Sequence, residues 1–119
     1  MDIARVKGKA VGRSRGSAYG DLVTAVAVDP SAAPSVAEQT RSTLAQLDGI
    51  LAELGSDKSR IVQATVYMAD LNRKAEMEVE WVKWIGTDPK AWPQRACVGV
   101  QLMPTDLVEI VVVAARKVA

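Results

Sequence analysis

The segment LVEIVVVAA, residues 107–115, constrains the fold of this chain more than any other feature. It is rich in β-branched residues, as β-strands are. Side chains of a strand alternate between the two faces of a sheet, and here apolar residues occupy both faces. The one polar side chain in the segment is Glu109. We therefore expect a strand over residues 107–116 that is covered on both sides.

Two helices are predicted in the middle of the chain. Ser35 followed by Glu38 fits a capping box, apolar residues then recur at helical spacing, and Gly55 lies where this first helix is expected to end. The second helix is expected to run to about Ile85 and to stop at the glycine that follows. Its predicted N-terminal cap is one of two residues, Asp70 or Asn72.

Further strands are predicted on both sides of these helices. Residues 3–28 are expected to form short strands broken by glycines, and residues 60–68 and 95–102 to form one strand each. In the strand at 60–68, one face is expected to carry Val62, Ala64, Val66 and Met68.

This order of elements predicts one domain over residues 1–119, of the α+β class, with a mixed, mostly antiparallel sheet and both helices on one face. Two helices cannot cover both faces of a sheet. We therefore expect the second face to be buried against another subunit.

Composition excludes several classes of protein. The net charge is +1 and the basic residues are spread along the chain, which argues against nucleic-acid binding. The first residues lack the apolar run of a signal peptide, and no apolar run is long enough to span a membrane, so a cytoplasmic protein is expected. There is no histidine, hence no histidine-based metal site or triad, and no nucleotide-binding glycine motif. We expect neither a metal nor a cofactor.

Glu109 is a candidate functional residue because a carboxylate in so apolar a strand is costly to bury without a partner. One interpretation is structural: an ion pair with Arg95 or with a neighbouring chain, or exposure at a strand end. The other is a carboxyl group at the edge of an apolar pocket, with a raised pKa that allows proton transfer near neutral pH. The residues alone leave both interpretations open.

Arg95 follows Trp92-Pro93-Gln94 at the start of a predicted strand, and its planar guanidinium suits bidentate binding of a carboxylate. Cys97 is two residues further on and shares its face of the strand. A nucleophilic role for this thiol is disfavoured, because the chain has no histidine to activate it.

The closing motifs resemble those of the RidA family of imine deaminases, which is also called the YjgF family. The resemblance rests on Arg95-Ala96-Cys97-Val98, the turn proline Pro104, and Val108-Glu109-Ile110. The segment from Ile61 to Leu71, IVQATVYMADL, also resembles the family's central strand and helix entry. The similarity extends over roughly residues 20 to 117.

This resemblance implies a chorismate-mutase-like fold assembled as a homotrimer, with sites in clefts between subunits. It implies that Arg95 binds the substrate carboxylate, that Glu109 positions and activates water, and that the backbone at Cys97 contacts the ligand; Trp92 is expected beside them. The implied reaction is hydrolysis of small 2-enamine or 2-imine acids to 2-keto acids and ammonia, without a cofactor.

The N-terminal part departs from the family pattern. The family's Gly-Pro-Tyr-Ser segment falls near residues 12–15, which read Gly-Arg-Ser-Arg, so the pocket tyrosine is absent unless Tyr19 replaces it. Val26 stands near a family glycine and cannot copy its close backbone approach. These changes favour a different substrate, such as a dicarboxylic enamine of aromatic-compound degradation whose second carboxylate meets Arg13 or Arg15. The other interpretation is that both arginines are surface residues. A non-catalytic trimer that binds a small metabolite or a partner protein is the alternative.

Overall fold

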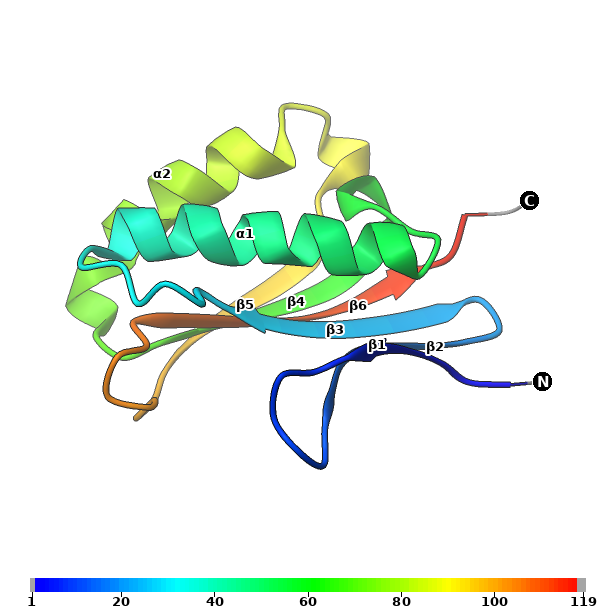
Figure 1. Cartoon of the computed structure of the whole chain (residues 1–119). Helices are drawn as coiled ribbons and strands as arrows, with labels where there is room; N and C mark the ends of the chain where they lie inside the picture. The colour runs from blue at the N-terminus through cyan, green and yellow to red at the C-terminus, as the bar shows by residue number, and fades with distance from the viewer. Residues whose placement is uncertain (1, 118–119) are drawn as a thin grey trace.

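The computed structural model describes residues 2–117. Within that range two α-helices lie on one face of a six-stranded sheet (Figure 1). The strands are β1 Ala4–Lys7, β2 Ser14–Tyr19, β3 Leu22–Val28, β4 Ile61–Met68, β5 Gln94–Gly99 and β6 Val108–Ala115. The helices are α1 Val36–Glu53 and α2 Lys74–Ile85, with 3-10 turns η1 Lys58–Arg60, η2 Leu71–Arg73 and η3 Pro89–Ala91.

The strands follow the order β1-β2-β3-β6-β4-β5. Every neighbouring pair is antiparallel except β4 and β5, which are parallel. This confirms the predicted α+β class and the mixed, mostly antiparallel sheet with both helices on one face. Strand β6 lies inside the sheet between β3 and β4, as its apolar sequence requires.

The core lies between the helices and one face of the sheet. Strand β6 places Val108, Ile110 and Val112 there, each fully buried. The alternate residues of β6, including Glu109 and Val111, point to the other face and are only half-buried. Within residues 2–117 no helix covers that second face, which is largely apolar along β3 and β6 (Figure 1).

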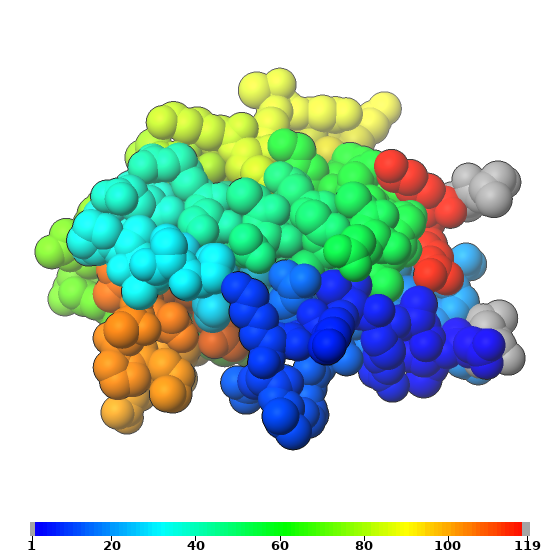
Figure 2. Space-filling model, in the orientation of Figure 1, coloured from blue at the N-terminus to red at the C-terminus, as the bar shows by residue number. Residues whose placement is uncertain are grey.

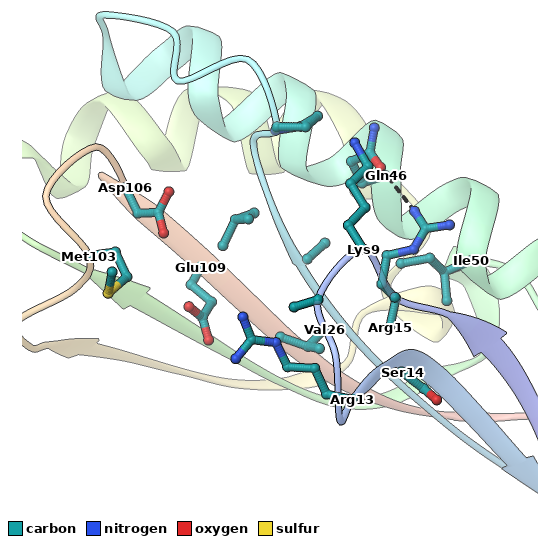
Figure 3. Close-up of a pocket in the computed structure, with 15 residues that line it drawn as sticks. Lys9, Arg13, Ser14, Arg15, Val26, Gln46, Ile50, Met103, Asp106 and Glu109 are labelled. Atoms are coloured by element: carbon teal, nitrogen blue, oxygen red, sulfur yellow. Dashed lines mark hydrogen bonds between the residues drawn. The ribbon is translucent and has the colours of Figure 1, made fainter.

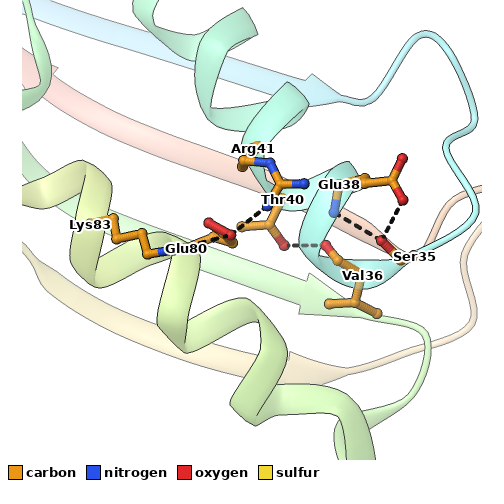
Figure 4. Close-up of polar contacts among 7 residues, drawn as sticks. All are labelled: Ser35, Val36, Glu38, Thr40, Arg41, Glu80 and Lys83. Carbon is orange, nitrogen blue, oxygen red and sulfur yellow. Dashed lines mark hydrogen bonds and ion pairs between the residues drawn. The ribbon is translucent and has the colours of Figure 1, made fainter.

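The ends of the two helices agree with the predictions, with one difference at the start of α2. The Oγ atom of Ser35 accepts a hydrogen bond from the Glu38 backbone N–H at 3.1 Å and contacts the Glu38 carboxylate at 3.1 Å (Figure 4), which confirms the N-terminal cap. Asp70 caps the 3-10 turn η2, and α2 continues from that turn at Lys74 without a side-chain cap. Gly86 ends α2 with a φ of 85°, a conformation that favours glycine.

Three strand predictions were wrong in detail. Ile61 pairs with Ala114 and Gln63 with Val113, so Val62 between them is the extra residue of a β-bulge. Its side chain is 58% exposed and does not share the buried face of Ala64, Val66 and Met68. Strand β5 ends at Gly99, not at residue 102, because its partner β4 ends at Met68. Gly16 does not break a strand but lies within β2.

Gly16 is required there by close packing. A Cβ atom at this position would lie 2.6 Å from Cγ2 of Ile50, a residue of α1. Strand β2 and helix α1 thus approach more closely than any larger residue allows.

An ion pair joins the two helices. Glu80 of α2 is 6% exposed, and its carboxylate lies 2.6 Å from NH1 of Arg41 on α1 and 3.9 Å from Nζ of Lys83 (Figure 4). A buried carboxylate needs such partners, since an unpaired one is costly. The contact holds α2 beside α1. It therefore also sets the position of α2 over β5.

Asp29, directly after β3, organises the loop that leads into α1. The residue is 4% exposed, and its carboxylate accepts hydrogen bonds from the backbone N–H groups of Ser31 and Ala33 and from the hydroxyls of Ser31 and Ser42. Burial by itself raises the pKa of Asp29, but these hydrogen bonds outweigh it and hold the pKa at about 2.

Asp29→Asn is expected to lower the free energy of unfolding at pH 6 by about 2 kcal/mol, because charge-assisted hydrogen bonds are lost. Since the folded pKa is depressed, the contribution of the wild-type carboxylate is fully present above the unfolded pKa of about 3.9 and is lost as the pH falls toward 2. Urea unfolding of both proteins from pH 6 to pH 2 should therefore show a difference that shrinks below pH 4. A difference independent of pH would contradict this account.

Candidate functional site

Arg95 and Glu109 lie on opposite faces of the sheet. Arg95 is in register with Ala64, which is buried beneath the helices. Glu109 is in register with Tyr67 and Val28 on the uncovered face. The two side chains therefore do not pair within one chain, and the ion-pair interpretation of Glu109 with Arg95 is wrong for a single copy.

The Arg95 side chain packs against helix α2. Its NH1 atom lies 2.5 Å from Oε1 of Glu78 and 3.8 Å from Sδ of Met77, and the guanidinium stacks over the ring of Trp81 at 4.9 Å. The pKa of Glu78 is lowered, chiefly because Arg95 donates a hydrogen bond to its carboxylate. Within residues 2–117, the Nε and Nη2 groups of Arg95 meet no protein acceptor, so their N–H donors are unused within the described chain.

Glu109 borders a cavity of about 480 Å³ on the other side of the sheet. Two segments enclose its ends, the loop between β1 and β2 and the connection between β5 and β6, which stand apart with a hollow between them in Figure 2. The cavity is also lined by Val26 from β3 and Asp106 from the connection. Its volume is in the range of small-molecule sites.

Two arginines of the N-terminal segment, Arg13 and Arg15, make different contacts. Arg13 lines the cavity and extends toward Glu109 (Figure 3). Arg15 also borders the cavity, but its Nε donates to the Lys7 carbonyl of β1 at 3.0 Å and its Nη1 to Oε1 of Gln46 on α1 at 3.4 Å. Arg13 is therefore the better candidate to meet a ligand beside Glu109.

The structure places the remaining candidates as follows. Cys97 lies on the Arg95 face of β5, half-buried against the core. Tyr19 is 53% exposed at the far end of β2 and does not line the cavity. Trp92 is also 53% exposed, and its Nε1 donates to the carbonyl of Gly86 at 2.9 Å. Neither aromatic side chain meets Glu109 within the chain.

Sequence reasoning missed Glu78, which contacts Arg95 directly. The available signal was the alternation of side chains along a strand, which puts Arg95 and Cys97 on one face. That face had to be either the helix side or the open side of the sheet. The position of Glu78 beside Met77, on the apolar side of α2, then made it a possible partner for a helix-side arginine. Among residues 2–117, no three Cys, Asp or Glu side chains converge as ligands of a metal would.

Neither helix within residues 2–117 combines the length and apolar character that a bilayer span needs.

Comparison with known proteins gives a family. The Endoribonuclease L-PSP family matches residues 22–116. The chain is 44% identical over 79 residues to the RutC family protein YoaB of Escherichia coli, which covers 66% of this chain and 68% of that protein. It is 30% identical over 96 residues to the 2-iminobutanoate/2-iminopropanoate deaminase of Salmonella typhimurium, covering 77% of this chain and 75% of that enzyme.

Solved structures agree with this result. A YjgF-family protein of Neisseria meningitidis superimposes with a TM-score of 0.90 at 35% identity, over 100% of this chain and 98% of that one. A member of the same family from Mycobacterium tuberculosis superimposes with a TM-score of 0.85 at 25% identity, over 96% and 99% of the two chains. With a family match over most of its length and the same arrangement of helices and sheet, this chain belongs to the YjgF family, also called RidA.

Proposed function

We propose that this protein hydrolyses small 2-imino or 2-enamine carboxylic acids to 2-keto acids and ammonia. The observation that carries the proposal is the pair of half-sites: a guanidinium with unused N–H donors at Arg95, and a carboxylate at the rim of a cavity at Glu109. The 30% identity to an enzyme named for 2-iminobutanoate and 2-iminopropanoate supports the same chemistry.

The proposed active unit is a homotrimer in which each site combines Arg95 of one copy with Glu109 of the next. Strand β5 is the last strand at one edge of the sheet, so a neighbouring copy can approach Arg95 from that side. Glu109 lies on the uncovered apolar face, which favours burial against another copy. Such packing would bring together two side chains that a single sheet keeps apart.

The chemistry in such a cleft is simple. Arg95 would hold the substrate carboxylate with its free N–H edge, and the backbone at Cys97 would support the ligand. Glu109 would take a proton from water as the water oxygen attacks the imine carbon, and would return it to the nitrogen. As the C–N bond of the adduct breaks, its hydroxyl proton passes to the departing nitrogen, which leaves as ammonia, and the 2-keto acid remains. Holding both reactants in place supplies much of the rate enhancement.

A substrate with a second carboxylate is the more specific candidate. It is favoured by Arg13, a cation that borders the same cavity as Glu109 and points toward it (Figure 3). A dicarboxylic enamine could place one carboxylate on Arg95 and the other near Arg13.

The direct test uses imino acids made in situ by an amino-acid oxidase, with catalase present to remove peroxide. The purified protein is expected to accelerate ammonia release above the rate in buffer for at least one small or acidic amino acid. If Arg13 selects dicarboxylates, Arg13→Ala should reduce the rate for the imine of aspartate or glutamate more than for that of alanine. No acceleration across a broad set of amino acids, with keto acids still bound, would favour a non-catalytic binding protein.

A further inference from the structure

Arg95 already has a carboxylate partner in its own chain. Oε1 of Glu78 lies 2.5 Å from Nη1 of Arg95, and the Arg95 side chain, which also stacks over the ring of Trp81, is only 16% exposed. The positive charge that would attract a substrate carboxylate is thus largely balanced before any ligand binds. A site evolved only to capture simple anions gains nothing from such a neighbour, because like charges close together repel.

Glu78 is also accessible to a ligand. Its side chain is 39% exposed, and within residues 2–117 only its Oε1 atom is used in an ion pair, which leaves Oε2 as an acceptor. Because Glu78 and Arg95 are in direct contact, an acceptor group and a donor group are neighbours at this position. Together they match a molecule that carries a negative and a positive group close to one another.

We propose that Glu78 is a specificity-determining residue that makes the Arg95 site prefer a protonated 2-imino acid over the 2-keto acid product. The inference rests on the proposed function. In a protonated imino acid, the nitrogen and the carboxylate are attached to the same carbon atom. The carboxylate binds the free edge of Arg95, and the nitrogen donates a hydrogen bond to Glu78.

The product differs from the substrate at this one position. Hydrolysis replaces the N–H donor with a carbonyl oxygen, which is an acceptor and is repelled by the Glu78 carboxylate. The same side chain that stabilises the bound substrate therefore weakens binding of the product. Glu78 would in this way promote product release as well as substrate selection.

The alternative is that the Glu78–Arg95 pair only ties β5 to α2. Glu78→Gln separates the two roles, because glutamine keeps the size of the side chain and an oxygen that can accept from Arg95, but removes the charge. A matched control is Glu76→Gln on the same helix, since Glu76 also pairs with an arginine, Arg73, at 3.0 Å.

Two measurements are made on each full-length variant. Calorimetry gives the Kd for pyruvate, and the coupled oxidase assay gives kcat/KM for 2-iminopropanoate. For Glu78→Gln we expect pyruvate to bind about tenfold more tightly and kcat/KM to fall about tenfold, opposite shifts that a structural role does not produce. Glu76→Gln should change neither value.

Two outcomes overturn the inference. If Glu78→Gln strengthens binding of pyruvate and raises kcat/KM together, Glu78 merely competes for Arg95; if both values stay at the wild-type level, the residue has no role in selection. Failure of the proposed function looks different. In that case the wild-type protein neither turns over 2-iminopropanoate nor binds pyruvate through Arg95.

Discussion

Arg95→Ala is expected to lower kcat/KM for imino-acid hydrolysis by about 10²–10³-fold, because the substrate loses its charge-assisted anchor. The effect should be this large because the guanidinium is mostly shielded from water, where a carboxylate contact is worth more than at an exposed site. Arg95→Lys keeps the charge but not the planar fork and should recover only part of the loss. Steady-state kinetics with the preferred imino acid measures both variants.

The controls separate binding from folding. Arg95 also packs on Trp81, so thermal melting and gel filtration must show that the variant keeps its fold and assembly. Arg73→Ala is the matched substitution, because Arg73 also pairs with a glutamate of α2 but is 60% exposed. Full activity of a folded Arg95→Ala protein would remove Arg95 from the site.

Two inactive variants should restore activity to each other when they assemble together. Arg95→Ala and Glu109→Gln each lack one half of every site, because within a chain the two residues occupy opposite faces of the sheet. In a cyclic trimer that contains both variants, one interface in three joins an intact Arg95 to an intact Glu109. Co-expression with two affinity tags, followed by purification on both, should therefore recover about one third of the wild-type activity.

A second pairing tests this interpretation. If the double variant Arg95→Ala/Glu109→Gln is co-expressed with Arg95→Ala, no interface has an arginine and no activity should return. Continued inactivity of the first mixture, in oligomers shown to contain both chains, would mean that the two residues do not form shared sites.

Sequence patterns predicted the fold well because the signals for helix ends and strands are local. Ser35 with Glu38 marked a helix start, Gly86 marked a helix end, and the β-branched residues of 107–115 marked a strand. The errors have physical causes that no local pattern contains. The bulge at Val62 depends on how β4 aligns with β6, and the end of β5 at Gly99 depends on where its partner strand stops.

The candidate site was predicted less completely. Arg95 and Glu109 stood out because of their residue types, but their separation by the sheet follows from strand order and register. Glu78 stayed hidden because its contact with Arg95 joins a helix to a strand far along the chain. Arg13 could not be distinguished from Arg15 by sequence, since the difference lies in the hydrogen bonds that hold Arg15 to β1 and α1.

The position of β6 between β3 and β4 has a consequence for synthesis on the ribosome. The ribosome makes β6 after the other five strands, yet this strand supplies the backbone partners that join the β1–β3 half of the sheet to the β4–β5 half. Until residues 108–115 leave the exit tunnel, each half exposes an unpaired strand edge to other nascent chains. The six-stranded sheet can therefore be completed only after β6 has been made.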